Sequence, residues 1–289
     1  MKRITIFLLP ILVWSCASSK TVDDRQTVSS QEQIVFSSNF ESEIQSCWSN
    51  RPNSGGWNFA GCGGFSNIGS GASVALAENE VSHSGNKALK ITFNLDEDYG
   101  GAEVRFPDSN HVFTRYYDYY SNNFDFAFGM KTQRIRSFNE ITQTNDFDIL
   151  TLAWGKTLYS DEVDMRGTNS LRWISINSNG GEFDWGGDYS DDGYERGKWY
   201  CVETEVKLNT PGRSDGWARL WVDGALKAEK TNISNRGTKT VGLNMVLFGG
   251  WYSNSAGGKN PQPNPESASI RYIDDIAISD NRVGCAVHN

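Results

Sequence analysis

The sequence has no apolar run long enough to cross a bilayer as a helix, and no stretch keeps a helical apolar period for three turns. It is also short of positive charge, with 27 Lys and Arg residues against 35 Asp and Glu residues and a net charge of −8. This balance excludes nucleic acid as an expected partner, because nucleic-acid binding needs a basic surface. An acidic ligand would need a locally basic site.

The N-terminus carries the features of an export signal. Lys2 and Arg3 precede an apolar stretch at residues 4–14. The following Ser15-Cys16 junction resembles a lipobox, in which a small residue stands directly before the lipid-bearing cysteine. We therefore interpret residues 1–15 as a lipoprotein signal peptide and Cys16 as the lipidation site. An ordinary secretory signal that contains a cysteine is the alternative.

Residues 16–33 are rich in Ser, Thr, Asp and Gln and are expected to form a flexible tether to a single domain, residues 34–289. Removal of Lys2 and Arg3 with the signal lowers the 27 basic residues to 25, which changes the net charge from −8 to −10. We expect an exported monomer attached to the bacterial cell envelope, at the outer membrane or the cell surface, through its lipid alone.

Four cysteines remain if Cys16 carries lipid: Cys47, Cys62, Cys201 and Cys285. An even number in an exported chain indicates disulfides, and three pairings are possible. The favoured one joins Cys47 to Cys62 in a local loop and Cys201 to Cys285. Their spacing matches no zinc pattern.

Strand patterns dominate the rest of the chain. Residues 198–208 alternate, with Tyr200, Val202, Thr204, Val206 and Leu208 on one face. Asp223-Gly224 between two such runs predicts a two-residue hairpin. Further strands are expected at residues 34–37, 88–95, 102–106, 115–120, 149–153, 171–177, 218–222, 225–230, 241–248 and 270–278. Many short strands in one domain predict an all-β sandwich of two antiparallel sheets.

Several segments resemble one family. Residues 197–224, GKWYCVETEVKLNTPGRSDGWARLWVDG, resemble a signature of the jelly-roll polysaccharide lyases that act on alginate and glucuronan. Residues 116–131, 248–251 and 272–276 resemble other strands of the same proteins. The resemblance covers most of residues 85–279 and implies a concanavalin A-like jelly roll. The resemblance also implies an acidic polysaccharide as the substrate and a reaction that requires no cofactor.

Such lyases cleave by β-elimination, in which a base removes the C5 proton of a uronate and an acid protonates the departing O4. Cations neutralise the carboxylate while charge develops. Lys131 matches a lysine of the family's active groove, and Ser170 and Arg172 match a Ser-x-Arg pair on another groove strand. The two residues of that pair share one face. Arg105 and Asn244 are further substrate-binding candidates, and Arg105 is also expected to pair with Glu103.

The sequence departs from the family at a tyrosine pair, where Phe183 and Trp185 stand instead. Their rings can stack on sugars, but they offer no phenol proton. Tyr189, Tyr194 or Tyr117 could carry the proton in their place, and we take Tyr189 as the candidate catalytic residue. Tyr117 is also taken as a substrate-binding candidate.

A structural calcium ion is a further option. Glu41 and Asp275 resemble residues that hold calcium in related sandwich domains, although two ligands fall short of the six to eight that calcium needs. Residues 139–169 resemble an insertion relative to the family.

Two functions are compatible with these features. One is a surface-anchored lyase that cleaves a uronate-containing polysaccharide. The other is a non-catalytic glycan-binding or adhesion lipoprotein on the same scaffold, with Phe183 and Trp185 in place of catalytic tyrosines.

Overall fold

Antiparallel strands account for most of the chain that the computed structural model describes. The described residues are 34–42, 65–70, 72–93, 97–124, 129–139, 141, 144–154, 171–176, 182–184, 195–253 and 268–285. They belong to one unit, Glu32–Asn289. The proposed signal and tether, with Cys16, lie outside the described residues.

The strands confirm the all-β expectation. They are β1 (Ile34–Ser38), β2 (Phe65–Ser70), β3 (Ser73–Glu78), β4 (Lys87–Phe93), β5 (Glu97–Ser109), β6 (His111–Tyr120), β7 (Gly129–Asn139), β8 (Thr144–Trp154), β9 (Leu171–Ile176), β10 (Glu182–Asp184), β11 (Trp199–Lys207), β12 (Gly216–Val222), β13 (Ala225–Ile233), β14 (Leu243–Ser253) and β15 (Ser269–Ser279).

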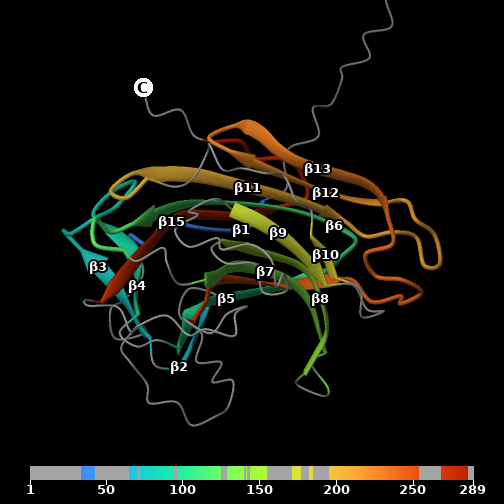
Figure 1. Cartoon of the computed structure of the whole chain (residues 1–289), viewed down its shortest axis with the longest axis horizontal. Coiled ribbons are helices and arrows are strands. Elements are labelled where there is room, and N and C mark those ends of the chain that lie inside the picture. Colours follow the sequence, from blue (N-terminus) through green and yellow to red (C-terminus); the bar gives the residue numbers. More distant parts are fainter. Residues whose placement is uncertain are drawn as a thin grey trace, which may run out of the picture. The chain divides into compact units, whose positions relative to one another are not determined.

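These strands form two sheets that face each other as two layers, with β11 to β13 along one and β5, β7 and β8 along the other (Figure 1). The eight-stranded sheet has the order β13-β12-β11-β6-β15-β4-β3, and β1 also pairs with β15. The seven-stranded sheet has the order β10-β9-β8-β7-β14-β5-β2. Strands β7 to β10 are consecutive in the sequence and adjacent in this sheet, whereas β14 and β5 join it from remote segments.

Alternation along the strands explains why the two sheets stack. Tyr200, Val202 and Val206 of β11 are buried in the core, as their period of two predicts. They share one hydrophobic cluster with residues of the seven-stranded sheet such as Ile135 and Phe248. The predicted hairpin is also confirmed: Asp223 and Gly224 join β12 to β13 with φ of 50° and 78°.

Two features differ from the sequence-based expectations. Strands β2, β3, β7 and β10 were not among the strands expected from alternation. Glycines, serines and charged residues obscure it in β2, β3 and β7, and β10 has only three residues. The expected insertion at residues 139–169 contains β8, which pairs with both β7 and β9. That part of the segment is therefore an integral strand of the sheet, and it extends beyond the strand expected at residues 149–153.

Candidate functional site

A β-bulge in β7 determines where Lys131 lies. Gln133 and Ile135 are fully buried between the sheets, so simple alternation would turn position 131 inward as well. However, Lys131 pairs with Ala153 while Gln133 pairs with Leu152, which leaves Thr132 as an extra residue. The bulge reverses the alternation and puts Lys131 on the outer face of the seven-stranded sheet.

Arg172 lies in register with Lys131. Ala153 of β8 pairs with Lys131 on one side and with Arg172 of β9 on the other. Directly paired positions of antiparallel strands share a face, and neighbouring strands are about 4.8 Å apart. The two cationic residues therefore occupy positions roughly 10 Å apart on one face.

Arginines extend the charge on this face, and two of them, Arg134 and Arg136, were not among the candidates predicted from the sequence. Arg134 pairs with Thr151, which is two residues from Ala153 and so on the same face. Arg136 follows at the next outward position, and Arg105 lies in the same row through Met245 of β14. The alternating arginines at 134 and 136 were a visible signal, but without an identified strand it could not be interpreted.

Acidic residues accompany these cations. Arg105 donates from Nε to Glu103 Oε1 at 3.0 Å, which confirms the expected pair. Asp148 pairs in register with Arg136. We refer to the outer face of the seven-stranded sheet at Lys131, Arg134, Arg136, Arg105 and position 172 as the cationic face.

Burial varies along the cationic face. Leu247 and Met245 of β14 and the side chain of Glu103 are almost completely buried there. Lys131 and Arg134 of β7 are only half-buried. The part of this face nearest to Lys131 is thus the better placed to meet a ligand.

The structure corrects the expectation for Tyr117. It lies on β6 in the eight-stranded sheet, paired with Cys201 and Asp274. Its ring stacks on His83 with centroids 3.5 Å apart and is almost fully buried. Tyr116 and Tyr120 point into the core, so Tyr117 faces away from the other sheet and from the cationic face.

Asn244 has a structural role instead of the expected substrate contact. Its Oδ1 accepts from the Phe138 N–H at 2.7 Å, and its Nδ2 donates to the Phe138 carbonyl and to Asp108 Oδ1, both at 2.9 Å. These bonds use both amide hydrogens. They bridge β7 and β14 beside the irregularity between Leu243 and Met245.

The register of β9 and β10 shows which position of β10 shares a face with position 172. Phe183 pairs with Ser175, whereas its neighbour Asp184 pairs with Ile174, two residues from Arg172. Position 184 therefore shares the face of position 172, and position 183 lies on the opposite face. Ser170, Trp185, Tyr189 and Tyr194 lie outside the described residues.

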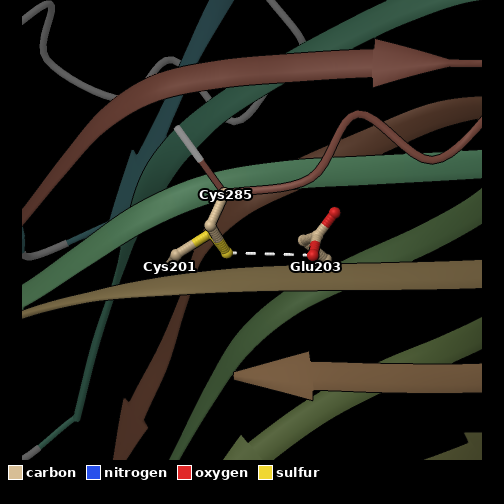
Figure 2. A group of neighbouring side chains, drawn as sticks. All are labelled: Cys201, Glu203 and Cys285. Atoms are coloured by element: carbon tan, nitrogen blue, oxygen red, sulfur yellow. Dashed lines mark hydrogen bonds between the residues drawn. A yellow bond between two sulfur atoms is a disulfide. The ribbon is translucent and has the colours of Figure 1, made fainter. Parts of the chain in front are cut away.

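The Cys201–Cys285 disulfide is confirmed and fixes the C-terminal segment to β11 (Figure 2). The buried carboxylate of Glu203 lies beside it, with Oε2 at 3.8 Å from Cys285 Sγ. Arg282 Nη2 donates to that oxygen at 2.7 Å, and the Gly284 N–H donates to Oε1 at 2.8 Å. Cys47 and Cys62 lie outside the described residues.

Glu41 and Asp275 hold one loop from two sides. Glu41 Oε1 accepts the N–H groups of Asn86 and Lys87. Asp275 binds the His83 ring and the Ser84 hydroxyl. Burial, aided by the charge of Asp275, raises the pKa of neighbouring Asp274 to about 7.

The carboxylates of Glu41 and Asp275 thus accept hydrogen bonds from groups of the protein itself. Within the described part of the chain, the one group of three His, Cys, Asp or Glu ligand atoms is Cys201, Glu203 and Cys285. Its two sulfurs are bonded to each other, so they provide no thiolate for a metal. Calcium at Glu41 and Asp275 stays a prediction from the sequence.

Comparison with known proteins identifies relatives of this fold. Residues 181–272 match the family model of polysaccharide lyase 14. The solved endo-β-1,4-glucuronan lyase of the fungus Trichoderma reesei is 14% identical, with a TM-score of 0.54 over 82% of this chain and 96% of that one. An alginate lyase from Chlorella virus is also 14% identical, with a TM-score of 0.54 over 76% and 94%.

A third solved structure, the marine PL-14 alginate lyase of Aplysia kurodai, is 18% identical with a TM-score of 0.50 over 71% and 86%. No curated protein matches the chain by sequence. The described residues contain no helix that is long and apolar enough to span a membrane.

The sandwich has the jelly-roll fold of the solved polysaccharide lyases named above. The segment 181–272 is related to polysaccharide lyase family 14, which confirms the resemblance seen in the sequence.

Proposed function

We propose that the chain cleaves a uronate-containing polysaccharide by β-elimination on the cationic face. The observation that supports this proposal is the register of Lys131, Ala153 and Arg172, in which positions 131 and 172 share one face of the seven-stranded sheet. The chain as a whole has a net charge of −8, so this local excess of positive charge is the feature expected of a site for a polyanion. The solved relatives named above cleave alginate or glucuronan.

Each component of the reaction has a candidate. Lys131 and Arg172 would bind the carboxylate of the reacting uronate and stabilise the charge that develops when the C5 proton leaves. The electrons of the C5–H bond form the C4–C5 double bond, and the C4–O4 bond breaks. Ser170 would help hold the carboxylate, and Tyr189 would accept the C5 proton or deliver one to O4.

The test is direct. Purified protein is mixed with alginate, glucuronan and a neutral glucan while absorbance near 235 nm (roughly the band of an unsaturated uronate) is followed. Growth of the signal with the uronate polymers alone supports the lyase. Binding of those polymers without any growth would replace it with the glycan-binding alternative.

We further propose that Cys16 anchors the protein to the cell envelope. The support is the Ser15-Cys16 junction after an apolar stretch. Cys16→Ala should move the protein from the membrane fraction to the soluble exported pool, while Cys47→Ala should leave it in the membrane fraction. A Cys16→Ala protein that stays membrane-bound would disprove the anchor.

A further inference from the structure

A fully buried ion pair connects the eight-stranded sheet to the bulge that places Lys131. Arg271 of β15 donates from Nε to Asp118 Oδ1 at 2.7 Å and from Nη2 to Asp118 Oδ2 at 3.0 Å. Both side chains have an exposed fraction of 0%. The Tyr120 hydroxyl donates to Asp118 Oδ2 at 3.0 Å, so the carboxylate is held from two directions.

A third hydrogen bond from Arg271 connects the two sheets. Nη1 donates to the main-chain carbonyl of Thr132 at 3.0 Å. Thr132 is the extra residue of the bulge between Lys131 and Gln133. A second bond crosses at the next residue, where Gln133 Nε2 donates to Thr114 Oγ1 at 2.8 Å.

Burying an arginine and an aspartate has a large desolvation cost, and replacing such a pair with hydrophobic residues often leaves the stability of the fold unchanged or higher. What a hydrophobic pair cannot do is hold a carbonyl at the residue that reverses the alternation of β7. Burial opposes the charge of Arg271, but the adjacent Asp118 outweighs it and raises the pKa of the guanidinium. The donor to Thr132 is therefore permanently protonated.

We propose that Arg271, oriented by Asp118, is a positioning residue that fixes the Thr132 bulge and thereby the placement of Lys131 on the cationic face. This role rests on the proposed function only for its effect on turnover. Its effect on Lys131 itself is independent of any reaction.

The kinetic test is a double-mutant cycle. Arg271→Lys should lower kcat on the order of tenfold to a hundredfold, because small misplacements of a catalytic group are costly, while KM changes little. Arg271→Met should lower kcat further. In a Lys131→Ala background, adding Arg271→Lys should lower kcat by less than about a further twofold, since the side chain that Arg271 positions is already absent.

Arg236→Lys is the matched control. Arg236 is a buried arginine that also donates to main-chain carbonyls, those of Asn209 and Val241, and these two residues lie in segments other than β7. Its replacement should lower the melting temperature and leave kcat unchanged. Additive effects of Arg271→Lys and Lys131→Ala, or an equal loss of kcat in Arg236→Lys, would overturn the proposal.

A structural measurement separates this inference from the proposed function. Lysines are reductively methylated with a ¹³C label, and the Lys131 resonance is identified by its loss in Lys131→Ala. That resonance should shift in Arg271→Lys and in Asp118→Asn but not in Arg236→Lys.

An unchanged Lys131 resonance in a folded Arg271 or Asp118 variant overturns the positioning role, even if the protein is a lyase. If the wild type cleaves no uronate polymer, the proposed function fails and the resonance still decides the positioning role. Failure of both variants to fold at low temperature also counts against it, since the pair would then be a requirement for folding in general.

Discussion

Lys131 and Arg172 are 41 positions apart in the sequence, yet each pairs with the same residue, Ala153 of β8. This relationship depends on the strand between them and on the bulge at Thr132. Without the bulge, Lys131 would share the inward face of Gln133 and Ile135, where a charged amine would be expensive to bury. The bulge therefore converts a core position into a position on the cationic face.

The first prediction concerns this pair. Lys131→Ala or Arg172→Ala should each lower kcat with a uronate polymer on the order of a hundredfold, because each removes a charged donor to the developing enolate. The measurement is the initial rate of absorbance growth near 235 nm (roughly), with circular dichroism to confirm the fold.

Two controls accompany these variants. Arg213→Ala removes an exposed cation from a turn between β11 and β12, and Tyr117→Phe removes a hydroxyl from the other sheet. Both should keep wild-type turnover. A large loss in Tyr117→Phe would contradict the placement of the site on the cationic face.

A second prediction concerns the proton carrier. Tyr189→Phe should lower kcat by about 10² to 10⁴, the usual contribution of general acid–base catalysis, while affinity for an oligouronate is retained because the ring remains. Tyr194→Phe is the matched control and should keep its turnover. If the two variants exchange behaviour, Tyr194 is the carrier, and if neither loses turnover, the tyrosine mechanism is wrong.

The fold was accessible from the sequence where alternation is regular. Strand β11 displays Tyr200, Val202 and Val206 at a period of two, and Asp223-Gly224 has one of the few compositions that suit a two-residue hairpin. Strand β7 was not accessible in this way, because Lys131, Gln133 and Ile135 obey no single period across a bulge. Only the resemblance to known lyases drew attention to Lys131.

The candidate site, likewise, could be predicted only in part. Resemblance identified Lys131 and Arg172, but it could not show that Tyr117 faces the opposite side of the sandwich. Asn244 is polar and close to β7 in space, yet its amide is occupied by the Phe138 main chain. The partners of a polar side chain depend on contacts between remote strands, which local sequence does not specify.

A third prediction concerns the tail. Replacing both Cys201 and Cys285 with Ala should lower the free energy of unfolding by about 2–4 kcal/mol, since the bond closes a long loop in the unfolded chain. The two cysteines are 84 residues apart. Urea denaturation under oxidising conditions measures the difference. A strong reductant should abolish the difference in unfolding free energy between the wild type and the double variant. A difference that persists in reductant would mean that packing, not the disulfide, provides the stability.

The last prediction concerns pH and Glu205, on the outer face of the eight-stranded sheet. Burial alone would raise the pKa of its carboxyl, but hydrogen bonds from His111, Trp217 and Arg219 outweigh burial and hold the pKa below its ordinary value. A depressed pKa means that the carboxylate stabilises the fold fully at pH values above its unfolded pKa of about 4.3. That contribution is lost as pH falls through the lower folded value.

Glu205→Gln should therefore be less stable than the wild type near neutral pH, and the difference should shrink as the pH falls below about 4. Unfolding in urea at a series of pH values measures it. Glu229→Gln is the control: Glu229 shares the Arg219 partner but is exposed, so its replacement should have little effect at any pH. A Glu205→Gln deficit that stays constant down to pH 3 (roughly) would show that the amide disturbs packing and that the charge contributes nothing.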